Sequence, residues 1–380
     1  MGREIWRRPG GPHSASPPEY DQPMRVQTPG RGPLFPDQGP LGARIKRRLI
    51  GGTAEILGFI LLTLLSPLLM LAGFLVDLVL WIRNRRPFVT IRMIPAIWWF
   101  LFGEMKAYLK LIFIYFFTGG PWGRGSIRRR RWIYALRIAW ARNHLIAIRV
   151  LFGIEFELEG EELTAPGPYV LMPRHVSILD NLIGDVFIGH PQGIGVRYVI
   201  KEEIRALTPI DIGGRWIPTV FVKRGSLDPD TEIAAVRALT HDMSPGEIMA
   251  IYPEGTRPTK KKIARAQAVI AEKQPEIAPL AARLNHLLPP RLGGPLAILD
   301  EASAGTDIVF CGHVGLEGLR TVKDVWAGVL VHRKIKIRFW RYDGTQIPQG
   351  DAARTEWLYD KWQMIDDWVG EELTARGETD

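Results

Sequence analysis

A histidine and an aspartate stand five residues apart in the stretch MPRHVSILDN, residues 172–181. A neutral imidazole can accept a proton from a hydroxyl group when a carboxylate holds its other ring nitrogen. Residues five apart in a straight helix point about 140° away from each other, so two mid-helix side chains would not meet. His175 and Asp180 can meet if His175 lies in a loop and Asp180 lies in the opening turn of the next helix.

The residues around this pair allow that arrangement. The apolar run YVLM predicts a strand that ends at Pro173, and Ser177 is suited to the N-cap of a helix. His175 would then be a general base that Asp180 orients. The alternative is that Asp180 stabilises the helix N-terminus electrostatically and that His175 is a solvated loop residue.

A second stretch, IYPEGTRPTKKK at residues 251–262, predicts a strand, a glycine turn and a basic helix. Backbone N–H groups and an arginine converge on an anion at such a turn. Arg257 would bind a phosphate through two parallel hydrogen bonds, and Gly255 would allow a close backbone approach. The alternative is a tight turn with a surface arginine.

A third stretch, TVFVKRG, predicts a strand that ends in Lys223 and Arg224. Cations at a strand end in an α/β sheet point toward the face where ligands usually bind. A solvated strand end is the alternative.

Short apolar runs alternate with helical patterns from about residue 153 onward, which predicts an α/β domain. The predicted strands are FELEG, PYVLMPR, RYVIK, TVFVK, EIMAIYP, DIVFCGH and KIKIRFW. The predicted helices are ILDNLIGDVFIG, DTEIAAVRALTHDM, KKKIARAQAVIAEK, GPLAILDEAS and, as a C-terminal extension, ARTEWLYDKWQMIDDWVGEEL.

The N-terminal third has a different composition. Residues 1–43 are crowded with Pro and Gly and predict a disordered tail. Residues 44–118 predict a membrane-associated helical region, because the run from Ile56 to Val76 carries no charge and can cross a bilayer. Basic clusters stand on both sides of the run. It therefore either dips into the membrane and returns, with a bend at Pro67, or crosses once.

Two further helices are predicted near the membrane surface. Residues 94–117 contain Glu104, Lys106 and Lys110, which favours an interfacial or re-entrant helix. Residues 119–152, with the run RRRR and several tryptophans, predict a basic amphipathic helix in the headgroup region. The net charge of +9 calls for acidic partners. The position of the basic run beside lipid-seeking segments favours anionic lipids over nucleic acid.

Cysteine and metal chemistry are not indicated by the sequence. The single cysteine, Cys311, excludes an intramolecular disulfide, cannot by itself build a zinc site, and is expected to be a buried core thiol. No cluster with metal-ligand spacing is visible, so we expect neither a metal nor a cofactor.

The stretches HVSILD, TVFVKRG and PEGTR occur in the order and spacing of the glycerolipid acyltransferases, the family of 1-acylglycerol-3-phosphate acyltransferase, and the resemblance covers about residues 150–315. The stretch NHLLPPRLGGPLAILDE also resembles the subgroup of lysocardiolipin and lysophosphatidylinositol acyltransferases. The resemblance implies a mixed sheet flanked by helices, with a catalytic domain at 153–315 and a C-terminal extension at 316–380. Two positions depart from these patterns: Arg174 stands where the family usually has Asn, and Asn181 stands where the subgroup tends to have an aromatic residue.

The resemblance also implies roles for residues. His175 would be the general base and Asp180 its orienting partner, while the phosphate would be held by Arg224, Glu254, Gly255, Thr256 and Arg257. The expected protein is an acyltransferase at the cytoplasmic face of a membrane, of the bacterial inner-membrane type. It would move a fatty acyl group from acyl-CoA or acyl carrier protein to lysophosphatidic acid, giving phosphatidic acid. The alternatives are another lysophospholipid headgroup, a hydrolase using the same pair, or a basic scaffold for anionic lipids or nucleic acid.

Overall fold

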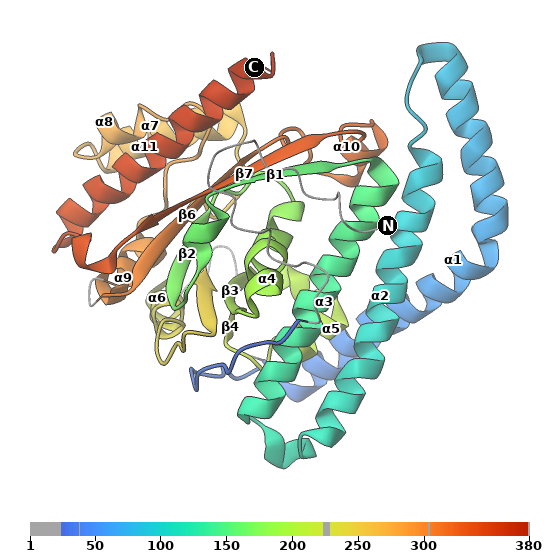
Figure 1. Cartoon of the computed structure of the whole chain (residues 1–380), viewed down its shortest axis with the longest axis horizontal. Coiled ribbons are helices and arrows are strands. Elements are labelled where there is room, and N and C mark those ends of the chain that lie inside the picture. Colours follow the sequence, from blue (N-terminus) through green and yellow to red (C-terminus); the bar gives the residue numbers. More distant parts are fainter. Residues whose placement is uncertain (1–23, 38, 223–228, 303–304, 379–380) are drawn as a thin grey trace.

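A seven-stranded mixed sheet forms the centre of the computed structural model, which describes residues 24–37, 39–222, 229–302 and 305–378 (Figure 1). The strand order is β1-β7-β6-β2-β5-β3-β4, and neighbouring strands run parallel except for the antiparallel pair of β6 and β7. The strands are β1 (Glu155–Glu159), β2 (Tyr169–Pro173), β3 (Gly195–Lys201), β4 (Thr219–Val222), β5 (Glu247–Ala250), β6 (Asp307–Val314) and β7 (Lys334–Tyr342). The predicted strands and the predicted mixed α/β sheet are confirmed.

Both faces of the sheet are covered, which explains the continuous apolar runs of its central strands. Alternate residues of β2 enter two different cores: Tyr169 and Leu171 pack on the α3 side, and Val170 and Met172 pack on the α11 side. The α3 face carries α3 (Ile127–Phe152), the 3-10 helix Leu179–Leu182, the π-helix Gly184–Gly189 and α4 (His190–Gln192). The α11 face carries α6 (Pro229–Ala238), α9 (Gly293–Ala302) and α11 (Asp351–Ala375).

The remaining helices are short or lie at the edges of the domain. The predicted helix ILDNLIGDVFIG is present, divided into the 3-10 turn and the π-helix. The others are α5 (Thr208–Gly213), α7 (Lys260–Lys273), α8 (Ala278–Ala281), α10 (Val322–Trp326) and the 3-10 turns Gly120–Gly123, Glu161–Thr164, Glu202–Ala206 and Gly344–Gln346.

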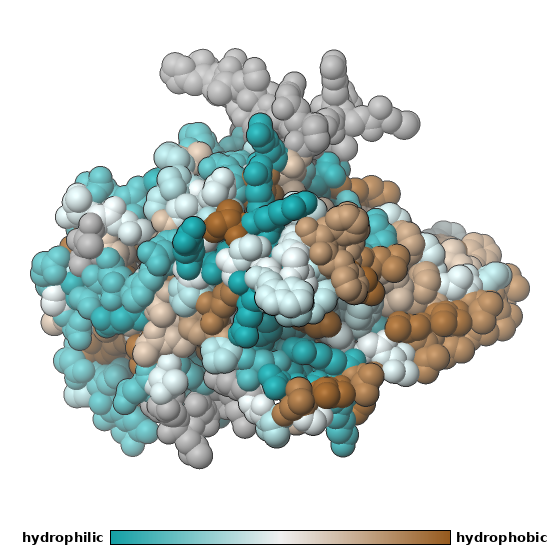
Figure 2. Space-filling view, turned by 90° about the horizontal axis from the view of Figure 1, so that it is seen from below, coloured by the Kyte–Doolittle hydropathy of each residue, from teal (hydrophilic) through white to brown (hydrophobic). Residues whose placement is uncertain are grey.

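Two long helices stand beside the domain as an antiparallel hairpin, α1 (Leu41–Asn84) and α2 (Thr90–Phe117) (Figure 1). By length and composition, α1 is the one helix in the described residues that is long and apolar enough to cross a membrane. Its 44 residues would span about 66 Å in a straight helix, but α1, which includes Pro67, is bent along its length (Figure 1). The chain returns through α2, after a turn in which Arg85 has a φ of 53°. Figure 2 shows apolar side chains concentrated on the projecting part of the molecule.

The acidic residues of α1 are buried against α2 and α5. Asp77 is buried and accepts hydrogen bonds from the backbone N–H groups of Thr90 at 3.0 Å and Ile91 at 2.8 Å. Glu55 is also buried and accepts from the Tyr108 hydroxyl at 2.5 Å and from Thr208 N at 3.2 Å. These carboxylates cap the first turns of α2 and α5, where helices leave N–H groups without partners.

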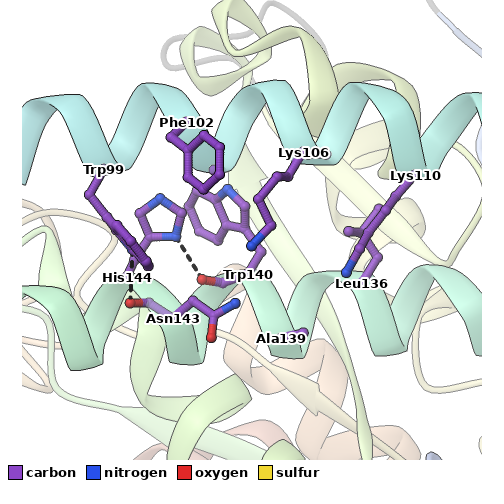
Figure 3. A pocket seen from close by; sticks show the side chains of 11 residues that line it. Trp99, Phe102, Lys106, Lys110, Leu136, Ala139, Trp140, Asn143 and His144 are labelled. Atoms are coloured by element: carbon purple, nitrogen blue, oxygen red, sulfur yellow. Dashed lines mark hydrogen bonds between the residues drawn. The ribbon is translucent and has the colours of Figure 1, made fainter. Parts of the chain in front are cut away.

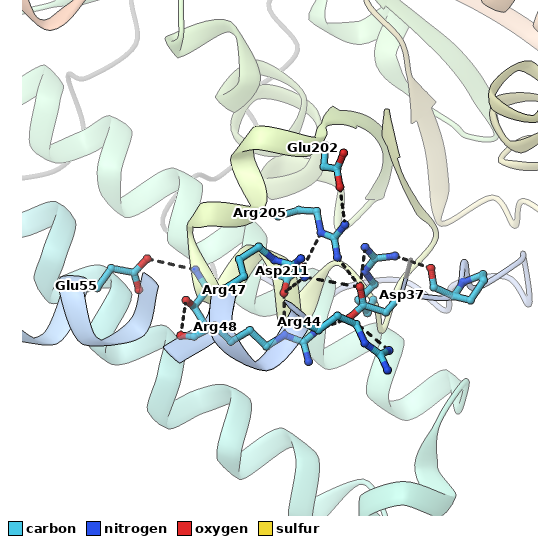
Figure 4. Close-up of polar contacts among 11 residues, drawn as sticks. Asp37, Arg44, Arg47, Arg48, Glu55, Glu202, Arg205 and Asp211 are labelled. Atoms are coloured by element: carbon cyan, nitrogen blue, oxygen red, sulfur yellow. Dashed lines mark hydrogen bonds and ion pairs between the residues drawn. The ribbon is translucent and has the colours of Figure 1, made fainter. Parts of the chain in front are cut away.

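The basic residues that precede the apolar run bind the domain (Figure 4). Arg47 and Arg48 both donate to the buried Asp211 of α5, with distances of 2.9 and 2.7 Å to Oδ2. Arg205 donates to Asp211 Oδ1 at 2.8 Å and also pairs with Asp37. This cluster attaches the start of α1 to α5.

Two predicted boundaries differ from the structure. Within the predicted tail, Gly30 N donates to the buried Glu247 at 2.6 Å, and Arg130 donates to the carbonyl oxygens of Gly30 and Gly32 at 3.1 and 2.7 Å. Residues 24–37 therefore pack against the domain, while residues 1–23 lie outside the described residues. In addition, β7 inserts between β1 and β6, so the predicted C-terminal extension supplies an internal strand of the sheet.

Candidate active site

The candidate site lies where the neighbouring parallel strands β2 and β5 end at the same edge of the sheet. His175 follows the end of β2, and Glu254 follows the end of β5. Side chains at the carboxyl ends of parallel strands lie where α/β folds bind their ligands.

The sequence-predicted pair meets in the predicted way. His175 lies in the loop after β2, and Asp180 lies in the 3-10 turn that follows, with 3.2 Å between His175 Nδ1 and Asp180 Oδ2. The same oxygen accepts from Val176 N at 2.5 Å and Ser177 N at 2.7 Å. The N-cap of this turn is Ile178 and not the predicted Ser177, whose hydroxyl nevertheless accepts from Leu179 N at 3.2 Å.

Three donors on one buried oxygen fix both the carboxylate and the ring. Asp180 Oδ2 accepts from His175 Nδ1–H and so orients the ring. The other ring nitrogen, Nε2, is then the atom that can accept a proton. Tyr252 supports the arrangement: its ring lies 4.7 Å from the His175 ring, centroid to centroid, and its hydroxyl donates to the carbonyl of Asp180 at 3.0 Å.

Glu254 points into the interior of the protein. Its side chain is 1% exposed, and it accepts from His175 N at 2.9 Å and from Leu288 N at 3.3 Å. Burial raises the pKa of this carboxyl to about 8. Glu254 was predicted to bind phosphate. The structure instead makes it a link between the His175 loop, the end of β5 and the segment around Leu288.

Basic side chains lie close together at the turn after Glu254. Gly255 has a φ of 62°, and a Cβ there would come within 2.9 Å of Arg291 Cδ. Arg291 is exposed and belongs to the PPRLGG segment. The backbone hydrogen bond from Arg291 N to Pro253 O, at 2.9 Å, holds this segment against the turn.

Lys262 Nζ donates to Thr256 Oγ1 at 3.3 Å and to the carbonyl of Arg257 at 2.9 Å. Arg257 itself donates to the carbonyl of Arg320 at 2.5 Å. Arg224 and Lys223 lie outside the described residues.

Arg174 is an internal residue. It is 2% exposed and donates to the carbonyl of His313 at 2.6 Å and to Glu317 at 2.7 Å. Burial alone would raise the pKa of Glu317, but the Arg174 guanidinium outweighs it and the net shift is downward. The arginine at this position, where the family usually has Asn, therefore forms an ion pair within the chain.

A second histidine, His313 at the end of β6, completes the surroundings of Asp180. Its Nε2 lies 3.1 Å from the carbonyl of Arg174, to which it donates, and 3.5 Å from Asp180 Oδ1. Burial lowers the pKa of His313, which favours the neutral ring. Sequence reasoning missed this residue, because its position depends on β6 lying beside β2.

Residues 155–282 match the family model described as Acyltransferase. This part of the chain is an acyltransferase domain. It contains β1 to β5, the His175–Asp180 pair and the turn at 254–257. The resemblance to the glycerolipid acyltransferase family that the sequence motifs indicated is confirmed.

Two known proteins show the range of similarity. The chain is 22% identical over 226 residues to 1-acyl-sn-glycerol-3-phosphate acyltransferase epsilon of Mus musculus, which covers 56% of this chain and 60% of that relative. It thus spans about three fifths of the length of the curated relative that it matches. It also aligns with the crystal structure of the 1-acyl-sn-glycerophosphate acyltransferase PlsC from Thermotoga maritima, with a TM-score of 0.46 and 14% identity, over 75% of this chain and 98% of that one.

An apolar cavity of 580 Å³ adjoins the His175–Asp180 loop of the acyltransferase domain. Ile178, Leu179 and Asn181 line it on the loop side. The other walls come from α2, α3 and the segment from β3 to β4, mostly through apolar side chains such as Leu111, Leu136, Ile200 and Ile210. A smaller pocket between α2 and α3 shares Trp140 and His144 with the cavity (Figure 3), so these two rings lie between the two hollows.

Cys311 is the buried core thiol that the sequence predicted. It lies on β6 with no exposed surface, and burial raises the pKa of the thiol well above its usual range. A thiol in this state is a poor nucleophile. In the ranges that the structure describes, no group of three or more His, Cys, Asp and Glu side chains is arranged to bind a metal ion.

Proposed function

We propose that the protein is a membrane-associated acyltransferase that moves a fatty acyl group from a thioester to the free hydroxyl of lysophosphatidic acid. The observation that carries this proposal is the contact between His175 Nδ1 and the buried Asp180 carboxylate, inside an acyltransferase domain. The donor is acyl-CoA or acyl carrier protein. An activated thioester needs a base for the alcohol and correct placement of both substrates, and it needs no enzyme nucleophile.

The reaction proceeds by direct attack within a ternary complex. His175 Nε2 accepts the proton of the acceptor hydroxyl as its oxygen bonds to the thioester carbonyl carbon. The carbon–sulfur bond then breaks, and the proton passes from His175 to the leaving thiolate. Two backbone N–H groups also bind Asp180 Oδ2 and hold it in place, and Asp180 stabilises the imidazolium that forms between these steps.

In this proposal, the turn at residues 254–257 and the adjacent Arg291 form the phosphate site. Arg257 and Arg291 carry guanidinium groups, whose planar fork matches a phosphate. Gly255 and Thr256 supply the turn itself, and Arg224 stays a predicted phosphate ligand. Glu254 acts by holding the His175 loop beside this turn.

The cavity is proposed to hold the acyl chain. It begins at the loop that carries Asp180, is lined mainly by apolar residues, and falls within the size range of small-molecule sites, about 300–1,000 Å³. The hairpin of α1 and α2 would place its entrance near lipid, with the domain on the cytoplasmic face.

The decisive experiment offers the purified protein a panel of lysophospholipids with acyl-CoA and acyl carrier protein donors, and identifies the lipids formed by mass spectrometry. Diacyl product from lysophosphatidic acid is expected, and His175→Ala should lower the rate about 10²- to 10⁴-fold. His241→Ala, at an exposed histidine outside the site, is the matched control and should keep full activity.

Three results would contradict the proposal in different ways. Free fatty acid without diacyl lipid would identify a hydrolase. Product only from lysocardiolipin or lysophosphatidylinositol would change the acceptor. Salt-sensitive lipid binding with no product, unaffected by His175→Ala, would indicate a scaffold.

A further inference from the structure

Several arginine side chains lie together where the start of α1 packs on α5 (Figure 4). This arginine cluster consists of Arg44, Arg47, Arg48, Arg205 and Arg215. The carboxylates that pair with it are Asp37, Asp211 and Glu202. Five arginines thus face three carboxylates, and two positive charges are left in excess.

The two aspartates are already shared among several arginines. Each oxygen of Asp211 accepts from two arginine side chains, and Asp37 accepts from Arg48 at 2.7 Å and from Arg205. Arg44 lies 3.9 Å from Asp37 Oδ2, which is beyond hydrogen-bond distance. Among the residues that the structure describes, its side chain donates no hydrogen bond, so the Arg44 guanidinium is free to bind another acceptor.

The cluster is accessible from outside the protein on its α1 side. The side chains of Arg44, Arg47 and Arg48 are 28%, 27% and 34% exposed. On the α5 side, burial lowers the pKa of Arg215, and the neighbouring Arg205 lowers it further. An anion bound at the exposed side would offset this repulsion between cations and would accept charge-assisted hydrogen bonds.

Apolar side chains stand beside these arginines on the same turns of α1. Leu41, Ile45 and Leu49 are 62%, 49% and 64% exposed and form a stripe at helical spacing. Arg44 and Arg48 border this stripe, because a helix has 3.6 residues per turn. Basic residues beside an apolar stripe place a helix in the headgroup region of a membrane and attract anionic lipids. The stripe therefore favours the phosphate of a lipid over a free phosphate ion.

We propose that the arginine cluster binds the phosphate of an anionic phospholipid, whose acyl chains lie along Leu41 and Ile45. The planar guanidinium fork of arginine matches the oxygen geometry of a phosphate. This lipid site is built from other elements than the acceptor site proposed at residues 254–257, and it does not depend on acyl transfer.

The lipid site also adjoins the proposed acyl site. Ile204, Leu207 and Ile210 line the apolar cavity, and they belong to the same segment as Arg205 and Asp211. In the ranges that the structure describes, none of the five arginines lines the cavity. A lipid bound to the arginine cluster would therefore hold a segment of the cavity wall in place without entering the cavity.

The test measures thermal unfolding of the purified whole chain in an uncharged detergent, with short-chain phosphatidylglycerol or short-chain phosphatidylcholine added. Phosphatidylcholine is zwitterionic and measures the effect of the acyl chains alone. We expect half-maximal stabilisation at an about tenfold lower concentration of phosphatidylglycerol, which is the effect of one hydrogen bond to a charged group. Equal concentrations for the two lipids would overturn the inference. Inorganic phosphate that stabilises the protein as well as phosphatidylglycerol does would also overturn it, because the ligand would then be a free anion.

Substitutions at the two ends of α1 separate this lipid site from general attraction between charges. Arg44→Ala should leave the Tm without lipid unchanged, because this side chain makes no hydrogen bond of its own among the described residues, and should remove most of the tenfold preference. Arg44→Lys, which keeps the charge, should retain part of it. Arg83→Ala removes an exposed arginine near the other end of α1 and is the matched control, with the full preference expected. A preference that survives Arg44→Ala, or that falls equally in Arg83→Ala, would overturn the inference.

Discussion

At the scale of single residues, the five-residue spacing of His175 and Asp180 predicted a loop followed by a helix turn, and the structure has this geometry. The inward direction of Glu254 and the approach of His313 were not predictable. Both depend on which strands are neighbours: β5 and β6 flank β2, and a single sequence does not reveal strand order. The spacing in the sequence thus predicted the contact between His175 and Asp180, whereas the residues around this pair depend on the order of the strands in the sheet.

Glu254→Gln tests whether this residue positions His175 or binds phosphate. Glutamine can still accept from one backbone N–H, but its amide group would oppose the other donor, so the loop shifts. We expect kcat to fall about 10²-fold, with little change in the acceptor KM, because small displacements of a catalytic group are costly. A higher KM with unchanged kcat would indicate phosphate binding instead.

Arg291→Ala tests the cation that the PPRLGG segment brings against Gly255. A hydrogen bond to a charged group contributes about 1.5–3 kcal/mol, which corresponds to an increase of about 10- to 100-fold in the acceptor KM. Arg257→Ala should have a similar effect. Monoacylglycerol, which lacks the phosphate, is the control acceptor. Equal losses with both acceptors would show that Arg291 only supports the turn.

At the scale of elements, periodicity predicted the strands, because each must place alternate residues in one of two cores. The packing of residues 24–37 was not predictable, because a segment rich in Pro and Gly has no periodic pattern. Its order comes from distant groups such as Glu247 and Arg130. Charges in α1 were read as membrane-topology signals, but Arg47 and Arg48 are bound to α5.

Asp211→Asn tests the attachment of α1 to α5. Burial alone would raise the pKa of Asp211, but hydrogen bonds from Arg205, Arg48 and Arg47 outweigh it and lower the pKa. The stabilisation is therefore present above the unfolded-state pKa, about 3.9, and is lost as the pH falls through the folded-state value. At pH 7 the variant should be destabilised by about 3–5 kcal/mol, because buried Arg205 loses a partner.

The measurement for Asp211→Asn is thermal unfolding in detergent from pH 7 down to pH 3. The difference in stability between the wild type and the variant should shrink at the acid end. Asp367→Asn, at an exposed carboxylate that accepts from Gln363 one helical turn away, is the control and should change stability by less than about 1 kcal/mol. A difference that stays constant with pH would contradict the charge-based attachment.

At the scale of the whole molecule, the apolar hairpin and the cavity are connected, since α2 contributes to both. The sequence predicted membrane-seeking helices in this region. It did not indicate that the return path would be α2, because the run from Ile56 to Val76 has the same composition in either topology. Helix α2 thus contributes both to the wall of the proposed acyl site and to the exposed apolar surface of the hairpin.

The last prediction concerns what holds the protein on membranes. Leu64 and Leu68 are 72% and 66% exposed on one face of α1, so lipid contact should dominate and washing at 1 M salt should not release the protein. Leu64→Lys with Leu68→Lys should weaken retention in vesicle flotation, because each lysine costs about 2.5–3.5 kcal/mol near the bilayer centre. The matched pair Leu64→Ala with Leu68→Ala should stay bound. Release of the wild type by salt alone would show that binding is electrostatic, through basic residues, and that α1 does not insert.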